Sequence, residues 1–230
     1  MRLIQSADFP FAMVLITLLI APSIAPRLRA AEAQVKPAPL DMDAAQAEVK
    51  DKYAKAHPEV QEFILHTARS FGPSGMWLNE NAYAALTPEQ REERVTYLVK
   101  LFEDADYGRH LCNALAEASA LRDKRLVPGL IKIAGYEKEG EDYDCRPKWI
   151  AISALARQES DDAVPVLIGL VDFGNQNCRL WSRAALARMA KDDFKADKQA
   201  WNKWWMSQGH ESIDPKYLKP WTPPKTAKSE

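Results

Sequence analysis

The sequence has little of what nucleotide-binding and nucleic-acid-binding proteins normally carry. Its 230 residues include only nine glycines, which is few for a sheet-rich fold or for one that cradles a nucleotide. The 31 basic and 32 acidic side chains leave a formal net charge of −1, whereas a general nucleic-acid binder carries a basic surplus. No Gly-x-Ser-x-Gly, phosphate-loop or dinucleotide-binding motif is present. The sequence therefore predicts no nucleic-acid partner, and no catalytic residue can be named.

Metal-binding and redox motifs are also missing. The four histidines are scattered, and the three cysteines contain no Cys-x-x-Cys pair. The segment 137–144 carries five carboxylates in eight residues, but it lacks the order of ligands that defines an EF-hand. We therefore expect a solvated loop there, and neither a metal nor a cofactor.

The amino-terminal residues indicate export. An uncharged apolar run covers residues 11–21, with Arg2 upstream and Pro22 directly after it. This length suits a signal-peptide core and falls short of the roughly 20 residues that span a bilayer. Small residues at the −3 and −1 positions predict cleavage after Ala33. We expect a signal peptide at 1–33 and a mature chain in the periplasm or outside the cell, without a membrane span; an uncleaved anchor is the alternative.

Helix signals dominate the first part of the mature chain. Residues 34–42 form a proline-bearing linker, and residues 43–106 form an N-terminal helical region. Within that region Pro58 stops one predicted helix and opens the next. Thr87 and Gln90 stand at capping-box spacing and predict another helix start.

Residues 107–208 repeat a pattern. The segment Leu-Val-Pro-Gly-Leu-Ile at 126–131 matches Ala-Val-Pro-Val-Leu-Ile at 163–168, and 37 residues separate the two Val-Pro pairs. Upstream, the segments 153–157 and 184–188 share Ala-Leu-Ala-Arg at a separation of 31 residues. A repeat of this length with two helices is typical of an α-solenoid, because one helical hairpin cannot bury both of its faces alone. The predicted fold class is therefore all-α, an α-α superhelix of stacked helical hairpins with extra N-terminal helices, followed by an irregular tail at 209–230.

Each predicted hairpin has an A helix rich in Ala and Leu and a B helix that begins near Val-Pro. Proline fits in the first turn because its missing N–H would be unpaired there anyway. We expect Asp123 to cap the first B helix and Ser160 or Asp161 to cap the second. Leu155 and Leu186 should occupy equivalent buried positions in successive A helices.

The Val-Pro segments that follow Ala- and Leu-rich helices resemble HEAT repeats. Residues 144–205 are more specifically similar to the C-terminal part of exported bacterial HEAT-repeat domain-containing proteins. The similarity rests on Arg-Pro-Lys-Trp at 146–149, an Asn-rich turn at 175–177 and a Trp-x-x-Trp-Trp helix at 201–205. The resemblance implies a HEAT-like α-solenoid and scaffold-type binding of a protein partner, and it implies no reaction.

The last repeat helix carries Trp201, Trp204 and Trp205 at helical spacing. A terminal repeat has no successor to cover it, so we expect these rings to form a hydrophobic lid. Lys198 and Lys203 would then face water.

By resemblance to HEAT arrays, the B helices line the concave face. Two groups of residues on or near these helices are candidates for partner binding. The first comprises positions that point away from the core, namely Lys132, Gly169, Asp172 and Lys203. The second lies at one rim of the stack and comprises Asn175, Asn177 and Arg179.

Cys112, Cys145 and Cys178 are spaced by 33 residues each. Cys145 and Cys178 should stand at the starts of adjacent A helices, on the same end of the stack. The axes of packed helices lie about 8–10 Å apart, whereas a disulfide needs its two Cα atoms at about 4.4–6.8 Å. Capping turns at the helix starts can bring the two Cα atoms this much closer. Two interpretations stay open: a Cys145–Cys178 disulfide with Cys112 as a buried free thiol, or three reduced thiols.

The sequence thus predicts a non-enzymatic protein–protein interaction or scaffolding module of the cell envelope. Two alternatives remain. One is an accessory subunit or enzyme of the envelope with a site in residues 43–106. The other is a cysteine-based redox or stress protein.

Overall fold

The structure is a computed structural model that describes residues 42–71, 83, 86–104, 106, 108–136 and 145–222. The predicted signal peptide at 1–33, the linker up to residue 41 and the acidic segment 137–144 lie outside the described residues. The chain divides into two units, residues 1–36 and 37–230, and all described residues belong to the second.

Every regular element among the described residues is helical, and no strand occurs there, so the all-α prediction is confirmed. In chain order the α-helices are α2 (Met42–Lys52), α3 (Pro58–Phe71), α5 (Pro88–Asp104), α6 (Cys112–Leu121), α7 (Val127–Ala134), α8 (Arg146–Gln158), α9 (Val164–Leu170), α10 (Gln176–Ala190), α11 (Lys198–Ser207) and α12 (Pro215–Leu218). Short 3₁₀ turns are η2 (Arg109–Leu111), η3 (Lys124–Leu126) and η4 (Asp161–Ala163).

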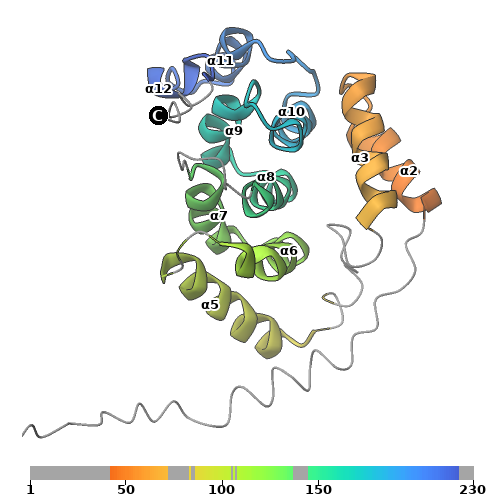
Figure 1. The fold of residues 1–230 in the computed structure, drawn as a ribbon, viewed down its shortest axis with the longest axis vertical. Helices are drawn as coiled ribbons and strands as arrows, with labels where there is room; N and C mark the ends of the chain where they lie inside the picture. Colours follow the sequence, from red (N-terminus) through yellow and green to blue (C-terminus); the bar gives the residue numbers. More distant parts are fainter. Residues whose placement is uncertain are drawn as a thin grey trace, which may run out of the picture. The chain divides into compact units, whose positions relative to one another are not determined.

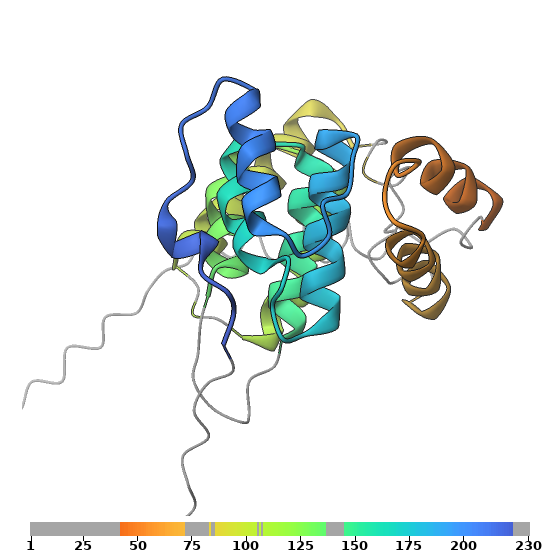
Figure 2. The ribbon, with the colours of Figure 1, turned by 90° about the horizontal axis from the view of Figure 1, so that it is seen from above.

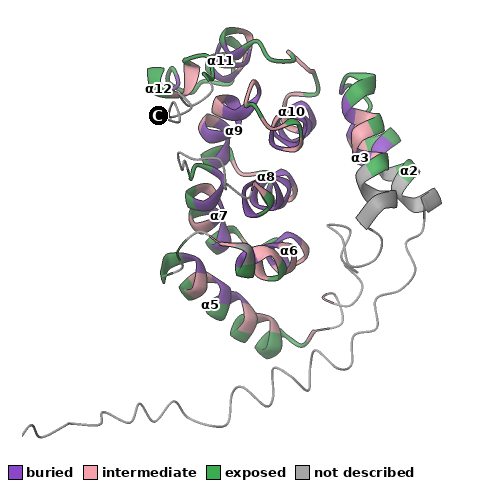
Figure 3. Ribbon diagram, in the orientation of Figure 1, coloured by how far each residue is buried: buried purple, intermediate pink, exposed green. Residues whose placement is uncertain are grey.

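Helices α5 to α11 form two layers (Figure 1). Helices α6, α8 and α10 lie side by side in the first layer, and α5, α7, α9 and α11 lie in the second (Figures 1 and 2). Helix α8 packs against α6, α7 and α10, and α10 packs against α9. Burial concentrates where the layers face each other (Figure 3).

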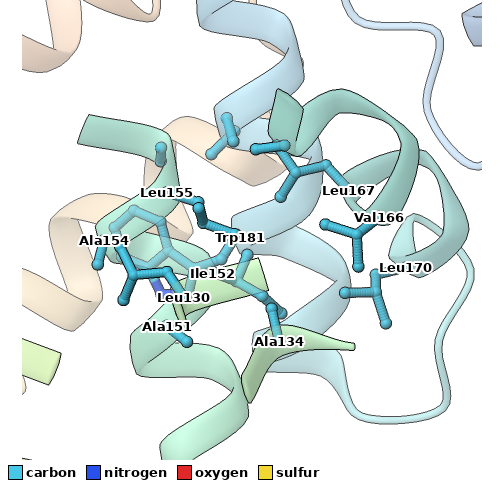
Figure 4. Close-up of a cluster of buried hydrophobic side chains, with 14 of the residues drawn as sticks. Leu130, Ala134, Ala151, Ile152, Ala154, Leu155, Val166, Leu167, Leu170 and Trp181 are labelled. Atoms are coloured by element: carbon cyan, nitrogen blue, oxygen red, sulfur yellow. The ribbon is translucent and has the colours of Figure 1, made fainter. Parts of the chain in front are cut away.

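Helix α8 is the centre of the core, with eleven of its 13 residues buried. Its Ile152 and Leu155 gather with Leu130, Leu167 and Trp181 from neighbouring helices (Figure 4). Leu155 on α8 and its predicted counterpart on α10, Leu186, are 1% and 0% exposed. Burying large aliphatic side chains of this kind contributes about 1.5–3 kcal/mol each.

The connection from a first-layer helix to a second-layer helix is built twice in the same way. Helix α6 is followed by Arg122 and helix α8 by Glu159, both in the left-handed conformation, with φ of 50° and 48°. An extended residue follows, then a 3₁₀ turn, and then a helix that begins with Val-Pro. The residues before these two helices, Leu126 and Ala163, both have φ −81° and ψ −19°. The two Val-Pro segments therefore occupy matching positions in successive helical pairs.

Most predicted helix starts are found. Thr87 and Gln90 exchange capping-box bonds, with the Thr87 N–H donating to Gln90 Oε1 at 3.0 Å and the Gln90 N–H donating to Thr87 Oγ1 at 3.2 Å. The Asp123 side chain accepts from the Arg125 N–H at 3.0 Å. Of the two alternative caps expected for the second B helix, Ser160 or Asp161, Ser160 stands at the cap position of the 3₁₀ turn, but its side chain makes no cap hydrogen bond. The turn closes instead through the Ser160 carbonyl, which accepts from the Ala163 N–H.

The N-terminal pair α2 and α3 packs together, and α3 also contacts α10. Helix α3 begins at Pro58 as predicted. Helix α2 ends at Lys52, ahead of the predicted stop at Pro58, because residues 53–55 form a turn before the His57-Pro58 pair. The pair thus packs against the first layer at α10.

Candidate interaction surface

Lys132 is the exposed cation of α7, and its amine also ties α7 to α5. Its Nζ donates to the carbonyl oxygens of Phe102 at 3.3 Å and Glu103 at 2.8 Å, near the end of α5. A cation at a helix C-terminus is favourable, since carbonyls there lack intrahelical partners. The predicted binding residue therefore has a structural role while remaining on the surface.

Gly169, on the outer side of α9, is covered by the chain itself. Helix α12 packs against α9, and a Cβ built at Gly169 would lie 2.9 Å from Tyr217 Cδ1. The absence of a side chain at Gly169 permits this close approach. We call residues 213–222 the C-terminal segment.

Asp172 joins the C-terminal segment to the start of α11. One carboxylate oxygen lies 2.7 Å from Lys198 Nζ, and the other accepts from the Trp221 N–H at 2.9 Å. Lys198 Nζ also donates to the Lys219 carbonyl at 2.5 Å. The prediction that Lys198 faces water is wrong: its side chain is 7% exposed, because the C-terminal segment covers it and supplies an acceptor for the buried ammonium.

The indole of Trp221 packs on the turn between α9 and α10. Its ring meets Phe173 edge-on, with centroids 5.6 Å apart, and a Cβ at Gly174 would lie 2.4 Å from Trp221 Cη2. At the other end of the segment, the Ile213 N–H donates to Asn202 Oδ1 at 2.9 Å. The C-terminal segment is thus anchored at both ends.

The predicted rim residues hold the same turn. Asn175 caps α10 by accepting from the Cys178 N–H at 3.2 Å. The Arg179 guanidinium donates to the carbonyls of Phe173 at 2.9 Å and Gly174 at 3.2 Å, and Asn177 is half-buried in the first turn of α10. The structure therefore brings the rim residues and Asp172 together around one turn.

Lys203 is exposed on α11, as predicted. Trp201 and Trp205 on that helix are 0% and 8% exposed, and Trp204 is half-buried. Trp201 contacts Phe194 edge-on at a centroid distance of 4.8 Å. The rings form a packed end to the stack, as expected for a terminal repeat.

The large hydrophobic side chains that remain exposed, among the described residues, are spread along the second layer and the C-terminal segment. They are Tyr97 on α5, Tyr136 directly after α7, Met206 on α11 and Trp221 in the C-terminal segment, with exposed fractions of 53%, 37%, 48% and 36%. All four belong to the second layer or to the segment that covers it. Aromatic and Met side chains are enriched at protein interfaces.

An ion-pair junction that no sequence motif predicted lies on the first layer. The guanidinium of Arg183 on α10 lies 2.9 Å from Glu59 Oε2 at the start of α3 and 3.0 Å from Asp193 Oδ2. Asp193 also accepts from the backbone N–H groups of His57 at 3.0 Å and Lys195 at 2.8 Å. Burial would lower the pKa of Arg183, but its bonds to the two carboxylates outweigh burial and raise it. No short motif marks these residues, since they are up to 136 positions apart.

A second arginine of α10 also helps to cover this side. Arg188 is 6% exposed, pairs with Glu159 and stands over the Tyr53 ring at 5.9 Å. Burial would lower the pKa of Arg188, but the contributions of Tyr53 and Glu159 raise it overall. The outer side of α10 is therefore an internal contact with the N-terminal helices.

The three cysteines are free thiols in the structure. Cys112 is the half-buried first residue of α6, Cys145 is the residue before α8, and Cys178 is the third residue of α10. The side chains of Cys145 and Cys178 are hydrogen-bonded to each other. This bond and burial raise the pKa of Cys178 well above its ordinary value.

Neither a metal cluster nor a membrane-spanning helix is found in the part of the chain that the structure describes. No group of three or more His, Cys, Asp or Glu side chains is placed there to hold an ion. No described helix has the length and apolar character needed to cross a bilayer.

Comparison of the chain with protein-family models, with curated proteins and with solved structures found no match.

Proposed function

We propose that this chain is an exported, non-enzymatic protein–protein interaction or scaffolding module of the cell envelope, and that its helical pairs are HEAT-like repeats. The twice-built connection supports the repeat assignment, since the same backbone path leads into α7 and α9. Stacked repeats present an extended surface, because each unit adds an equivalent helix to the same face.

The observation that carries the binding function is the location of the exposed large hydrophobic residues. Tyr97, Tyr136, Met206 and Trp221 all belong to the second layer or to the C-terminal segment over it. The first layer, by contrast, is covered at α10 by α3. We therefore assign partner binding to the second layer.

Within this layer the candidates from sequence contribute in two ways. Lys132 and Lys203 are exposed on α7 and α11 and offer charges to a partner. At α9 the partner meets Tyr217 and Trp221 of the C-terminal segment, which lie over Gly169 and the turn at 172–179.

A capture experiment with the mature chain tests this assignment. The surface variant is Tyr97→Ser, Lys203→Glu and Met206→Ser, three exposed positions on α5 and α11. The control is Lys55→Glu, the same charge reversal at an exposed position after α2. Asp172 is left intact, since its charge pairs with the buried Lys198.

Both variants and the wild-type chain are cross-linked in envelope extract after circular dichroism shows equal helicity. We expect at least one partner that the wild type and the control retain and the surface variant loses. An identical partner set for all three proteins would remove the second layer as the binding surface.

Export has its own test. The full chain is expressed with a C-terminal tag, and the mature protein is isolated from envelope and cytoplasmic fractions. We expect an amino terminus at Gln34 in the envelope fraction. Recovery of the protein in the cytoplasm with residues 1–33 attached would refute export.

A further inference from the structure

Two thiols meet where adjacent first-layer helices begin. Helices α8 and α10 pack side by side, with Cys145 directly before α8 and Cys178 in the first turn of α10. Their side chains are in hydrogen-bond contact. Cys112 opens α6, which packs on the opposite side of α8 from α10 (Figure 1).

The two partners differ in access. Cys178 is 0% exposed, and its position is fixed because its N–H bonds to the Asn175 side chain. Cys145 is half-buried and is therefore the more accessible of the two residues. Lys148, one turn into α8, is buried with its Nζ 2.8 Å from the Ala134 carbonyl, and its charge acts on Cys178.

We propose that Cys145 and Cys178 form a disulfide that links the first turns of α8 and α10, with Cys112 remaining a free thiol. The bond encloses residues 146–177 and so joins one helical pair covalently to the next. This proposal goes beyond partner binding and does not depend on it.

Thiol–disulfide exchange with a low-molecular-weight disulfide, oxidised glutathione, makes the bond. The Cys145 sulfur loses its proton and attacks one glutathione sulfur, which forms a mixed disulfide and releases one glutathione thiolate. Cys178 then loses its proton, and its sulfur attacks the Cys145 sulfur and expels the second glutathione. Two protein thiols are oxidised, one glutathione disulfide is reduced to two thiols, and these take up the two protons.

The order of the two steps follows from the surroundings. The hydrogen bond with Cys145 and burial raise the pKa of Cys178, so Cys178 is a poor first nucleophile. Once Cys145 carries glutathione, the hydrogen bond is gone and the Lys148 ammonium favours the thiolate of Cys178. The partly exposed cysteine therefore reacts first, and the buried one resolves the mixed disulfide.

Peptide mapping tests the pairing in the folded mature chain. The protein is equilibrated with oxidised and reduced glutathione, free thiols are alkylated, and trypsin separates the cysteines into peptides 110–122, 139–148 and 158–179. We expect a linked pair of 139–148 with 158–179, two hydrogens lighter than the sum of the reduced peptides, and an alkylated 110–122. Linkage through 110–122, or alkylation of both other peptides under oxidising conditions, would overturn the proposal.

Single variants test the order of steps. Cys178→Ser should hold glutathione on Cys145, because the resolving thiol is gone. Cys145→Ser should leave Cys178 free of glutathione while the chain is folded, and Cys112→Ser is the matched control that should form the same linked pair as the wild type. Rapid glutathionylation of Cys178 in folded Cys145→Ser would refute the assigned order, and the wild-type map decides the pairing even if a variant fails to fold.

Discussion

Arg183 has two carboxylate partners that should differ greatly in their contribution to stability. The Asp193 side chain is 3% exposed and the Glu59 side chain is 50% exposed, whereas the two distances are nearly equal. Breaking a buried pair costs about 3–5 kcal/mol, whereas a pair open to solvent contributes about 0–1 kcal/mol. We therefore compare Asp193→Asn with Glu59→Gln, since both changes replace a carboxylate oxygen by an amide.

The hydrogen-bond donors around Asp193 explain why an asparagine amide at this position should destabilise the fold. One carboxylate oxygen accepts from the Lys195 N–H, the other accepts from the His57 N–H, and both face Arg183. In Asp193→Asn one of these oxygens becomes an NH₂ group that faces donors. We expect a loss of about 3 kcal/mol in the free energy of unfolding for Asp193→Asn and at most about 1 kcal/mol for Glu59→Gln.

Urea unfolding at pH 7, followed by circular dichroism, measures both values. Double-mutant cycles that add Arg183→Met should give a large coupling energy with Asp193 and a small one with Glu59. Equal costs for the two single variants, or a larger cost for Glu59→Gln, would refute the reasoning from burial.

The same pair predicts a pH dependence. Burial alone would raise the pKa of Asp193, but hydrogen bonds from Arg183 and from the backbone of His57 and Lys195 outweigh burial and hold the pKa below its ordinary value. A carboxyl group with a lowered folded-state pKa stabilises the fold above its unfolded pKa, about 3.9, and this contribution is lost as the pH falls through the folded value. The stability difference between wild type and Asp193→Asn should therefore be constant from about pH 7 to 5 and shrink below about pH 4.

Three further changes test other contacts. Gly174→Leu should displace the C-terminal segment, because its Cβ would overlap the ring of Trp221; trypsin should then cleave this segment several-fold faster, and an unchanged rate would contradict the contact. Thr87→Ala should lower the free energy of unfolding by about 1 kcal/mol through loss of the cap. An unchanged free energy of unfolding in urea would contradict this contribution of the cap. The Cys145–Cys178 bond should stabilise the oxidised chain over the reduced one by about 3–4 kcal/mol, and coincident urea transitions would count against that gain.

Local signals predicted the helical pairs well. Proline fixes φ and suits a first helical turn, so Pro58 and the two Val-Pro pairs marked real helix starts. The capping box at Thr87 was readable because both partners lie within four residues. Such features depend only on residues that are close together in the chain, so the local sequence is enough to predict them.

Long-range burial was not predictable in this way. The sequence placed Lys198 in water because helical periodicity gave no sign that the C-terminal segment would cover it. The Arg183 junction joins α3, α10 and Asp193, and a buried charge is tolerated only once distant partners are present. The sequence placed Asp172 in a different candidate group from Asn175 and Arg179, whereas the fold brings all three around one turn through contacts that local sequence does not encode.

The left-handed residues at the ends of the first-layer helices explain how the chain turns with so little glycine. Arg122, Glu159 and Lys191 have φ of 50°, 48° and 57°, each at a cost of about 1–2 kcal/mol that glycine would not incur. In return, the unfolded chain is less flexible at these three residues than it would be with glycine, so it loses less conformational entropy when it folds. These residues also carry charge, and the Glu159 carboxylate at the end of α8 pairs with Arg188 on α10, the next first-layer helix. The turn that ends one helical pair therefore also holds that pair to the next.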